Sequence, residues 1–138
     1  FVMEEDQAYA NKVNKPIFID ITGHGCVNCR EMEARVWSDP RVLQILRDEF
    51  VLCALYVDDK RQLPENQWVV NPAGKTLKTI GKINADYVYR NYNVNYQPYY
   101  IILGNDGESV LGTRRYDLSV DGFIQFLTAG VAAYKAGK

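Results

Sequence analysis

Two cysteines stand three residues apart in the segment Cys26-Val27-Asn28-Cys29. At this spacing two residues share one face of a helix, so their sulfur atoms can form a disulfide or stand open as a dithiol. The pair follows an apolar run and a glycine turn, where a helix begins. Unpaired N–H groups and the helix dipole favour a thiolate there. The pattern predicts redox chemistry, with Cys26 as exposed nucleophile and Cys29 as resolving thiol.

Two carboxylates accompany the cysteine pair. Asp20 lies six residues before Cys26, inside the apolar run 16–21, and a buried carboxyl there can exchange a proton with a nearby thiol. Glu33 follows Cys29 by four residues and shares its helix face, where it can tune the pKa values of the pair. The alternatives are a strand-end aspartate bonded to backbone and a solvated glutamate on the helix surface.

A structural zinc site is the main alternative for the cysteine pair. Such a site needs two further ligands, and the remaining candidates are His24 and Cys53. Cys53 lies in an apolar run and has no partner at the right spacing, so we expect a core residue, no metal and no cofactor. His24, two residues before Cys26, can either stabilise the thiolate as a cation or contact a partner protein.

Composition excludes several other classes of protein. The chain has 138 residues, 47% of them hydrophobic, and a formal net charge of −1. This length favours one domain, and the charge gives no broad footprint for nucleic acid. Three cysteines are too few for a disulfide scaffold, and no apolar run is long enough to span a bilayer. The first residue is Phe1 rather than methionine, which indicates a processed or excised chain.

The order of apolar patterns predicts an α/β fold with a central mixed β-sheet flanked by helices. We expect a single domain over residues 1–138, with an irregular insertion at about 58–80 that contains Pro64, Pro72 and Gly74. Asp39 and Ser119 are placed to cap helices. The patterns favour helices over 4–14, 26–36, 82–92 and 120–134 and one from Pro40, and strands over 16–21, 50–57, 99–103 and 108–113.

These residues resemble the thioredoxin superfamily. A strand containing Asp20, a glycine turn, the Cys-Val-Asn-Cys motif, a helix and a proline before a late strand occur in the family's order. The Cys-Val-x-Cys and Ser-Asp-Pro-x-Val motifs are closer still to the C-terminal periplasmic thioredoxin-like domain of bacterial thiol:disulfide interchange proteins, the DsbD family. The resemblance is strong over residues 5–58 and a matter of pattern over 82–133.

The resemblance implies a thioredoxin-like fold and a thiol-disulfide oxidoreductase that reduces partner proteins. Its catalytic residues would be Cys26, Cys29, Asp20 and Glu33. Pro98 would follow a cis peptide bond and leave the Gln97 backbone free to pair with an extended substrate. We assign substrate binding to Gln97, Pro98, His24, Val27 and Asn28.

The family also implies a place and partners. The domain would be periplasmic, as the soluble part of a membrane-anchored or exported protein. It would receive electrons from a membrane-embedded domain of the same or a partner protein. Its partners would be disulfide-bearing periplasmic proteins, including those of cytochrome c maturation and disulfide isomerisation.

Two other functions remain open at this point. The same fold can serve a disulfide oxidase or isomerase, because direction depends on a reduction potential that the sequence does not give. The chain can also be a non-catalytic module that binds a metal or client proteins. Some residues depart from the family pattern: Gly25 precedes Cys26 where thioredoxin has tryptophan, and Gln97 replaces a smaller residue. Six tyrosines between Tyr87 and Tyr100 can form a docking surface or pack the insertion.

Overall fold

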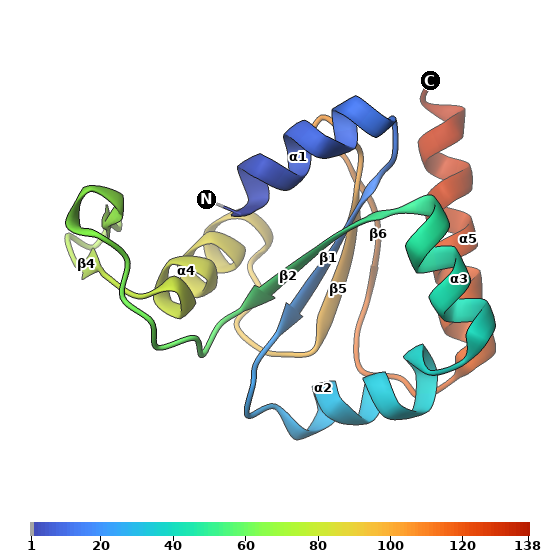
Figure 1. Cartoon of the computed structure of the whole chain (residues 1–138), viewed down its shortest axis with the longest axis horizontal. Coiled ribbons are helices and arrows are strands. Elements are labelled where there is room, and N and C mark those ends of the chain that lie inside the picture. Colours follow the sequence, from blue (N-terminus) through green and yellow to red (C-terminus); the bar gives the residue numbers. More distant parts are fainter. Residues whose placement is uncertain (1) are drawn as a thin grey trace.

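A mixed four-stranded sheet lies at the centre of the computed structural model, which describes residues 2–138 (Figure 1). The strand order is β2-β1-β5-β6. The first strand pairs in parallel with β2 and antiparallel with β5, and β5 pairs antiparallel with β6. The strands are β1 (Ile17–Thr22), β2 (Val51–Tyr56), β5 (Tyr99–Leu103) and β6 (Val110–Arg114).

Helices cover both faces of this sheet, which confirms the predicted α/β arrangement (Figure 1). One face packs against α1 (Val2–Val13) and α4 (Ile80–Tyr92). The other face packs against α2 (Val27–Met32), α3 (Pro40–Glu49) and α5 (Val120–Ala136). Two apolar cores result, one on each side of the sheet.

Because successive side chains of β1 point to opposite faces of the sheet, β1 contributes residues to both cores. Ile17, Ile19 and Ile21 are buried on the side of α1 and α4. Phe18 is buried on the opposite side, where its ring contacts those of Tyr100 and Phe123. Asp20 is two residues further along the strand and therefore faces the same side as Phe18. The register of β1 thus directs this carboxylate toward the layer that contains α2.

Capping residues fix the helix starts. Asp39 accepts a hydrogen bond from the backbone N–H of Arg41 and Pro40 occupies the first turn of α3, as predicted. Ser119 caps α5 in the same way, through the N–H of Gly122. Thr79 caps α4, which consequently begins two residues earlier than the apolar pattern indicated.

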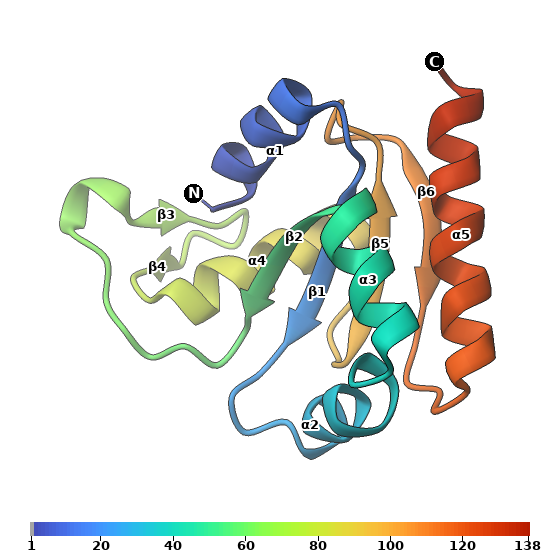
Figure 2. The same cartoon turned by 45° about the vertical axis from the view of Figure 1, so that its right-hand side comes forward.

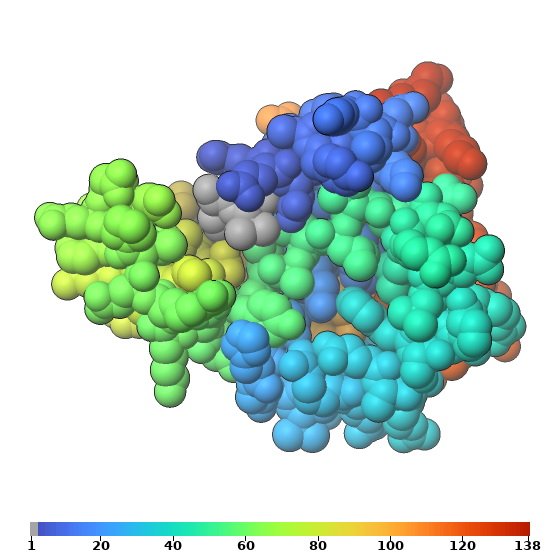
Figure 3. Space-filling model, viewed as in Figure 1, coloured from blue at the N-terminus to red at the C-terminus, as the bar shows by residue number. Residues whose placement is uncertain are grey.

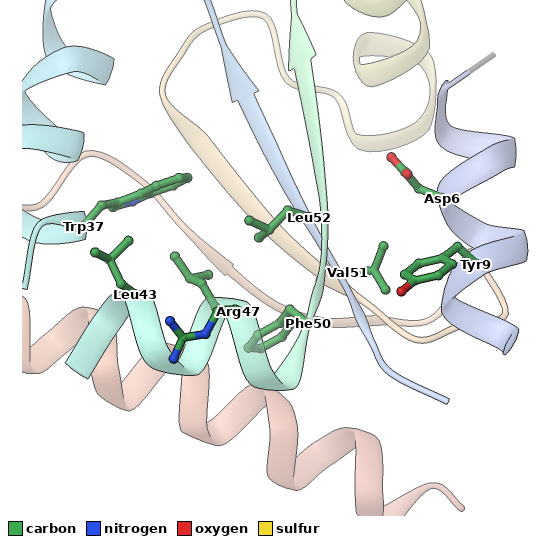
Figure 4. Close-up of a pocket in the computed structure, with 9 residues that line it drawn as sticks. Asp6, Tyr9, Trp37, Leu43, Arg47, Phe50, Val51 and Leu52 are labelled. Carbon is green, nitrogen blue, oxygen red and sulfur yellow. The ribbon is translucent and has the colours of Figure 1, made fainter. Parts of the chain in front are cut away.

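The prediction that residues 50–57 form a buried strand is wrong for one face. Within residues 2–138, β2 pairs on one side only and is an edge strand. Val51, Cys53 and Leu55 are buried, but the Leu52 side chain is 48% exposed. Leu52 and Val51 point to opposite sides of the strand, and the groove along this edge has a volume of about 460 Å³ (Figure 4). An apolar run does not distinguish a central strand from an edge strand.

The segment 58–80 forms a stem with a small hairpin (Figure 2). Gln62 bridges to Thr79 in the stem, and Leu63 donates a backbone hydrogen bond to Lys78. Beyond the stem lie a 3-10 turn (Glu65–Gln67) and the strands β3 (Val69–Val70) and β4 (Thr76–Leu77). The prolines in this segment led us to expect irregular structure, and the paired strands are a correction of that expectation.

Phe18 and Leu52 are register partners on adjacent strands, so they provide a matched test of the edge assignment. Replacing Phe18 with alanine should lower the free energy of unfolding by about 3–5 kcal/mol, because it empties a filled core. Replacing Leu52 with alanine should lower it by less than about 1 kcal/mol. Urea unfolding measures both values, and equal losses would contradict the placement of β2 at the edge.

Candidate functional site

The Cys26 and Cys29 side chains form a disulfide, with their Cα atoms 5.3 Å apart. Cys26 is the N-cap of α2, and its Sγ accepts a hydrogen bond of 3.2 Å from the backbone N–H of Cys29. Cys29 is buried, whereas Cys26 is only partly buried. The expected difference in exposure between the two cysteines is therefore present. The first turn of α2 therefore supplies one backbone donor to Cys26 Sγ, at the helix start that the sequence indicated.

The helix that carries the pair is shorter than predicted. It ends at Met32, and a π-helical turn over Glu33–Trp37 follows in place of the regular helix expected to residue 36. Val27 and Asn28, the two residues between the cysteines, are exposed; Val27 retains 76% of its accessible surface. They flank the disulfide on the surface of the molecule.

Asp20 has an unusual electrostatic environment. Burial disfavours its charged form, and the nearby Glu33 carboxylate adds repulsion, so its pKa rises to about 7. The Arg30 guanidinium acts in the opposite direction on the same pKa. Tyr100 is the register partner of Asp20 on β5, and burial raises the pKa of this phenol as well. Asp20 can therefore gain or lose a proton near neutral pH.

Arg30 connects the groups around Asp20. Its Nη2 atom donates hydrogen bonds to Thr22 Oγ1 at 3.0 Å and to Glu33 Oε2 at 2.9 Å. Glu33 is therefore paired with a cation and half-exposed. Sequence reasoning placed Asp20 and Glu33 together, and the structure brings them within electrostatic range. It missed Arg30, although the spacing of three residues to Glu33 on a helix was a visible signal.

The peptide bond between Gln97 and Pro98 is cis, as the resemblance implied. Pro98 is buried and Gln97 partly exposed, immediately before β5. The first residue of β5, Tyr99, pairs with Ile21 near the end of β1. The cis-proline loop and the Cys26 turn therefore leave the sheet at the same end.

His24 lies against the end of β2. Its ring stacks on Tyr56 with centroids 4.0 Å apart. Its backbone N–H donates to Asp58 Oδ1 at 2.8 Å, and that of Gly25 donates to Asp58 Oδ2 at 2.9 Å. These two hydrogen bonds lower the pKa of the Asp58 carboxyl. Sequence reasoning missed both partners, which lie more than thirty residues along the chain from His24.

Cys53 is a core residue, as predicted, and only 1% of its surface is exposed. Its thiol contacts the sulfur of Met3, and burial raises its pKa. Among residues 2–138, no group of three or more histidine, cysteine, aspartate or glutamate side chains is placed to hold a metal ion.

Comparison with known proteins identifies the family. A family model described as thioredoxin-like matches residues 2–104. The chain belongs to the thioredoxin-like family. The predicted thioredoxin-like fold is likewise confirmed by solved structures that superpose on almost the whole chain. A thioredoxin from Thermus thermophilus has a TM-score of 0.66 and 21% identity, and the match covers 98% of this chain and 88% of that one.

The sequence relatives of this thioredoxin-like chain carry the name expected from its motifs. The thiol:disulfide interchange protein DsbD of Salmonella typhi is 43% identical over 53 residues, which are 38% of this chain and 9% of that protein. The Citrobacter koseri protein of the same name is 43% identical over 49 residues, again 9% of its length. The chain therefore matches only a small part of these relatives.

Two further solved structures share the fold. A DsbH oxidoreductase has a TM-score of 0.70 and 13% identity, over 94% of this chain and 81% of that one. The C-terminal domain of Neisseria meningitidis DsbD, in its oxidised form, has a TM-score of 0.59 and 18% identity, over 92% of this chain and 90% of that one. None of the helices described within residues 2–138 has the length and apolar character needed to cross a membrane.

The raised pKa of Asp20 makes the stability of the thioredoxin-like domain depend on pH. Its folded pKa of about 7 exceeds the ordinary 3.8, so the folded state holds a proton that the unfolded chain releases. The stability linked to that proton is fully present below about pH 4, and it is lost as the pH rises from there through the folded pKa of about 7. Replacing Asp20 with asparagine should raise the free energy of unfolding by about 2–4 kcal/mol near pH 8.5 and change it little near pH 4. Urea unfolding at both pH values tests this, and a gain that does not depend on pH would contradict it.

Arg30 and Glu33 should shift the pKa of Asp20 in opposite directions. The change Arg30→Met removes the neighbouring cation and should raise that pKa further. The change Glu33→Gln removes the neighbouring anion and should lower it. An NMR titration of the Asp20 carboxyl carbon measures both shifts. Shifts of the same sign would show that the two variants act by rearranging the turn rather than through their charges.

Proposed function

We propose that this thioredoxin-like domain is a thiol-disulfide oxidoreductase that reduces disulfides in partner proteins. The observation that carries the proposal is the Cys26–Cys29 disulfide at the start of α2, in which Cys26 is partly buried and Cys29 is buried. This arrangement suits an attacking thiol and a resolving thiol. The DsbD relatives, named thiol:disulfide interchange proteins, support the same activity.

The reaction begins with the reduced pair. The Cys26 thiolate attacks one sulfur of the partner disulfide, whose S–S bond breaks, and the departing partner thiolate takes up a proton. A mixed disulfide now joins Cys26 to the partner. Cys29 then loses its proton and attacks Cys26 Sγ, and the second partner thiolate leaves and is protonated. Two electrons and two protons pass to the partner, and the domain is left with the Cys26–Cys29 disulfide.

Asp20 is the group we assign to proton movement. It lies on the face of β1 that faces α2, and its pKa of about 7 lets it accept the proton that Cys29 must lose. Glu33 contributes through its charge, which raises the pKa of Asp20 and makes the ionised Asp20 carboxylate a stronger base for that proton. Arg30 limits this effect because it pairs with Glu33.

The charges around the pair favour the reducing direction. A strong oxidant has a stabilised reduced form, in which a thiolate is held by positive groups. Here Asp20, Glu33 and Asp58 bring carboxylates to the site, and the nearby Arg30 is engaged by one of them. Negative groups disfavour a thiolate, so they disfavour the reduced state and make the pair a better electron donor.

Substrate binding is assigned to the surface around Cys26. The exposed Val27 and Asn28 flank the disulfide, and the loop of Gln97 and Pro98 lies at the same end of the sheet. An extended partner segment can pair with the free backbone of Gln97 while Cys26 reaches its disulfide. His24 is exposed beside this surface, where its ring can contact the partner.

We infer the setting from the DsbD relatives. The domain would work in the periplasm on disulfide-bearing proteins, including those of cytochrome c maturation and disulfide isomerisation. It would be re-reduced by a membrane-embedded domain of the same or a partner protein. The matched stretch is 9% of each relative's length, which leaves room there for such a domain.

Reduction of a disulfide protein by the purified domain tests the function. The variant Cys26→Ser should lose this activity entirely, whereas Cys29→Ser should accumulate the mixed disulfide with its partner. Mass spectrometry of the trapped species gives the site of attachment. Attachment at Cys29 instead of Cys26 would contradict the assigned order of attack.

The reduction potential decides the direction. Equilibration with glutathione should place the potential of the pair well below about −180 mV, on the reducing side of the isomerases. A value near about −120 mV would show an oxidase and would overturn the reductant role.

A further inference from the structure

The loop after β2 supports the redox turn through one carboxylate. Asp58 accepts hydrogen bonds from two consecutive backbone N–H groups, those of His24 and Gly25, at 2.8 and 2.9 Å. Cys26 follows directly, and its own N–H donates to Gly23 O at 3.2 Å. The turn that presents Cys26 is therefore bonded both to itself and to Asp58. Figure 3 shows the residues of this turn, in lighter blue, adjoining the green segment that follows β2.

The loop that carries Asp58 is itself anchored from three directions. The N–H of Val57 donates to Thr22 O, which ties the loop to the end of β1. The N–H of Gly81 donates to Asp59 O, and a Cβ at Gly81 would lie 2.6 Å from Asp59 N, so the start of α4 packs directly on the loop. The Asn84 amide donates to Tyr56 O at 3.0 Å. The Asp58 side chain is exposed, and these contacts hold the loop that carries it on both sides of Asp58.

The glycine at position 23 leaves room for the Asp58 carboxylate beside the turn. A Cβ at Gly23 would lie 3.2 Å from Asp58 Oδ2, closer than most side chains approach a neighbour. A glycine at this position lets the carboxylate lie against the backbone.

The contact between Asp58 and the turn also brings a negative charge near Cys26. Asp58 has no ion pair among those formed within residues 2–138, whereas its neighbour Asp59 is bound by Arg61 at 2.6 Å. The Asp58 carboxylate accepts a hydrogen bond from Gly25, one residue before Cys26, so its charge lies close to the residue that carries the attacking sulfur. The other charged or titratable groups around the turn are His24 in the turn itself, Asp59 and Arg61 beyond Asp58, and Arg30, Glu33 and Asp20 on the side of α2.

We propose that Asp58 is a positioning residue for the redox pair, which fixes the turn before Cys26 and sets the reactivity of the Cys26 thiol through its negative charge. This inference rests on the proposed reductase function, which it deepens. With its charge in place, the Cys26 thiolate is less populated and the pair is more reducing. Asp58 acts through the turn and through its charge, without contact with the partner disulfide.

The variant Asp58→Asn separates this role from simple support, and Asp59→Asn is its matched control. Alkylation of Cys26 by iodoacetamide in the reduced protein near pH 6 should become about fivefold faster in Asp58→Asn, because a repelling charge is gone. The equilibrium with glutathione should shift about fivefold toward the reduced domain. Asp59→Asn should change both values less than about twofold, since Arg61 already compensates Asp59.

Amide hydrogen exchange gives a measurement that does not depend on activity. The two N–H groups bond to different oxygens of Asp58, and asparagine keeps only one acceptor oxygen, so at least one of the His24 and Gly25 amides should exchange at least about tenfold faster in Asp58→Asn. Gly23→Ala should also speed this exchange, by displacing the carboxylate, but should not speed alkylation because the charge remains.

Three outcomes would overturn the inference: equal behaviour of Asp58→Asn and Asp59→Asn, slower alkylation in Asp58→Asn, or equal acceleration of alkylation by Asp58→Asn and Gly23→Ala. Slower alkylation would mean that the contact acts through shape alone. A wild-type domain that reduces no disulfide would instead refute the proposed function, and the alkylation and exchange results would still decide the role of Asp58.

Discussion

The central position of β1, with hydrogen-bonded neighbours on both sides, is the constraint on which the rest of the structure depends. Its backbone groups pair with β2 and β5, so the strand can lie between two helical layers without water. The alternation of side chains along β1 permits only one pairing register, because a shift by one residue would move Asp20 into the isoleucine core. The redox turn therefore leaves the sheet from a fixed point, and Asp20 is held beneath α2.

Asp20 and Asp58 lie on either side of this turn, and their environments shift their pKa values in opposite directions. Burial and the neighbouring Glu33 raise the pKa of Asp20, whereas two backbone N–H groups lower that of Asp58. Near neutral pH one group can therefore carry a proton while the other keeps its charge. This separation suits the roles that we propose, in which Asp20 exchanges a proton with the dithiol and Asp58 sets the charge near Cys26.

The sequence predicted features whose causes lie close together in the chain. The cysteine spacing, the Asp39 and Ser119 caps and the strand before Asp20 depend on neighbouring residues, and the structure contains them. The contact between Asp58 and His24 spans more than thirty residues, and no local pattern indicates it. The exposed face of β2 results from its position at the edge of the sheet. The apolar residues of β2 do not indicate that position. The roles of Gln97, Val27 and Asn28 in binding remain predictions.

The hydrophobic cores stabilise the domain, whereas the Cys26–Cys29 disulfide contributes little to its stability. A ring closed between residues three apart constrains the unfolded chain much less than a long loop would, so opening it removes little stability. The fold must therefore be held by burial, which the rings around Phe18 and the isoleucines of β1 provide. Cys53 lies in this core, where burial keeps its thiol protonated and away from thiol–disulfide exchange. Because stability depends only slightly on the Cys26–Cys29 bond, the pair can open and close while the sheet that positions it stays intact.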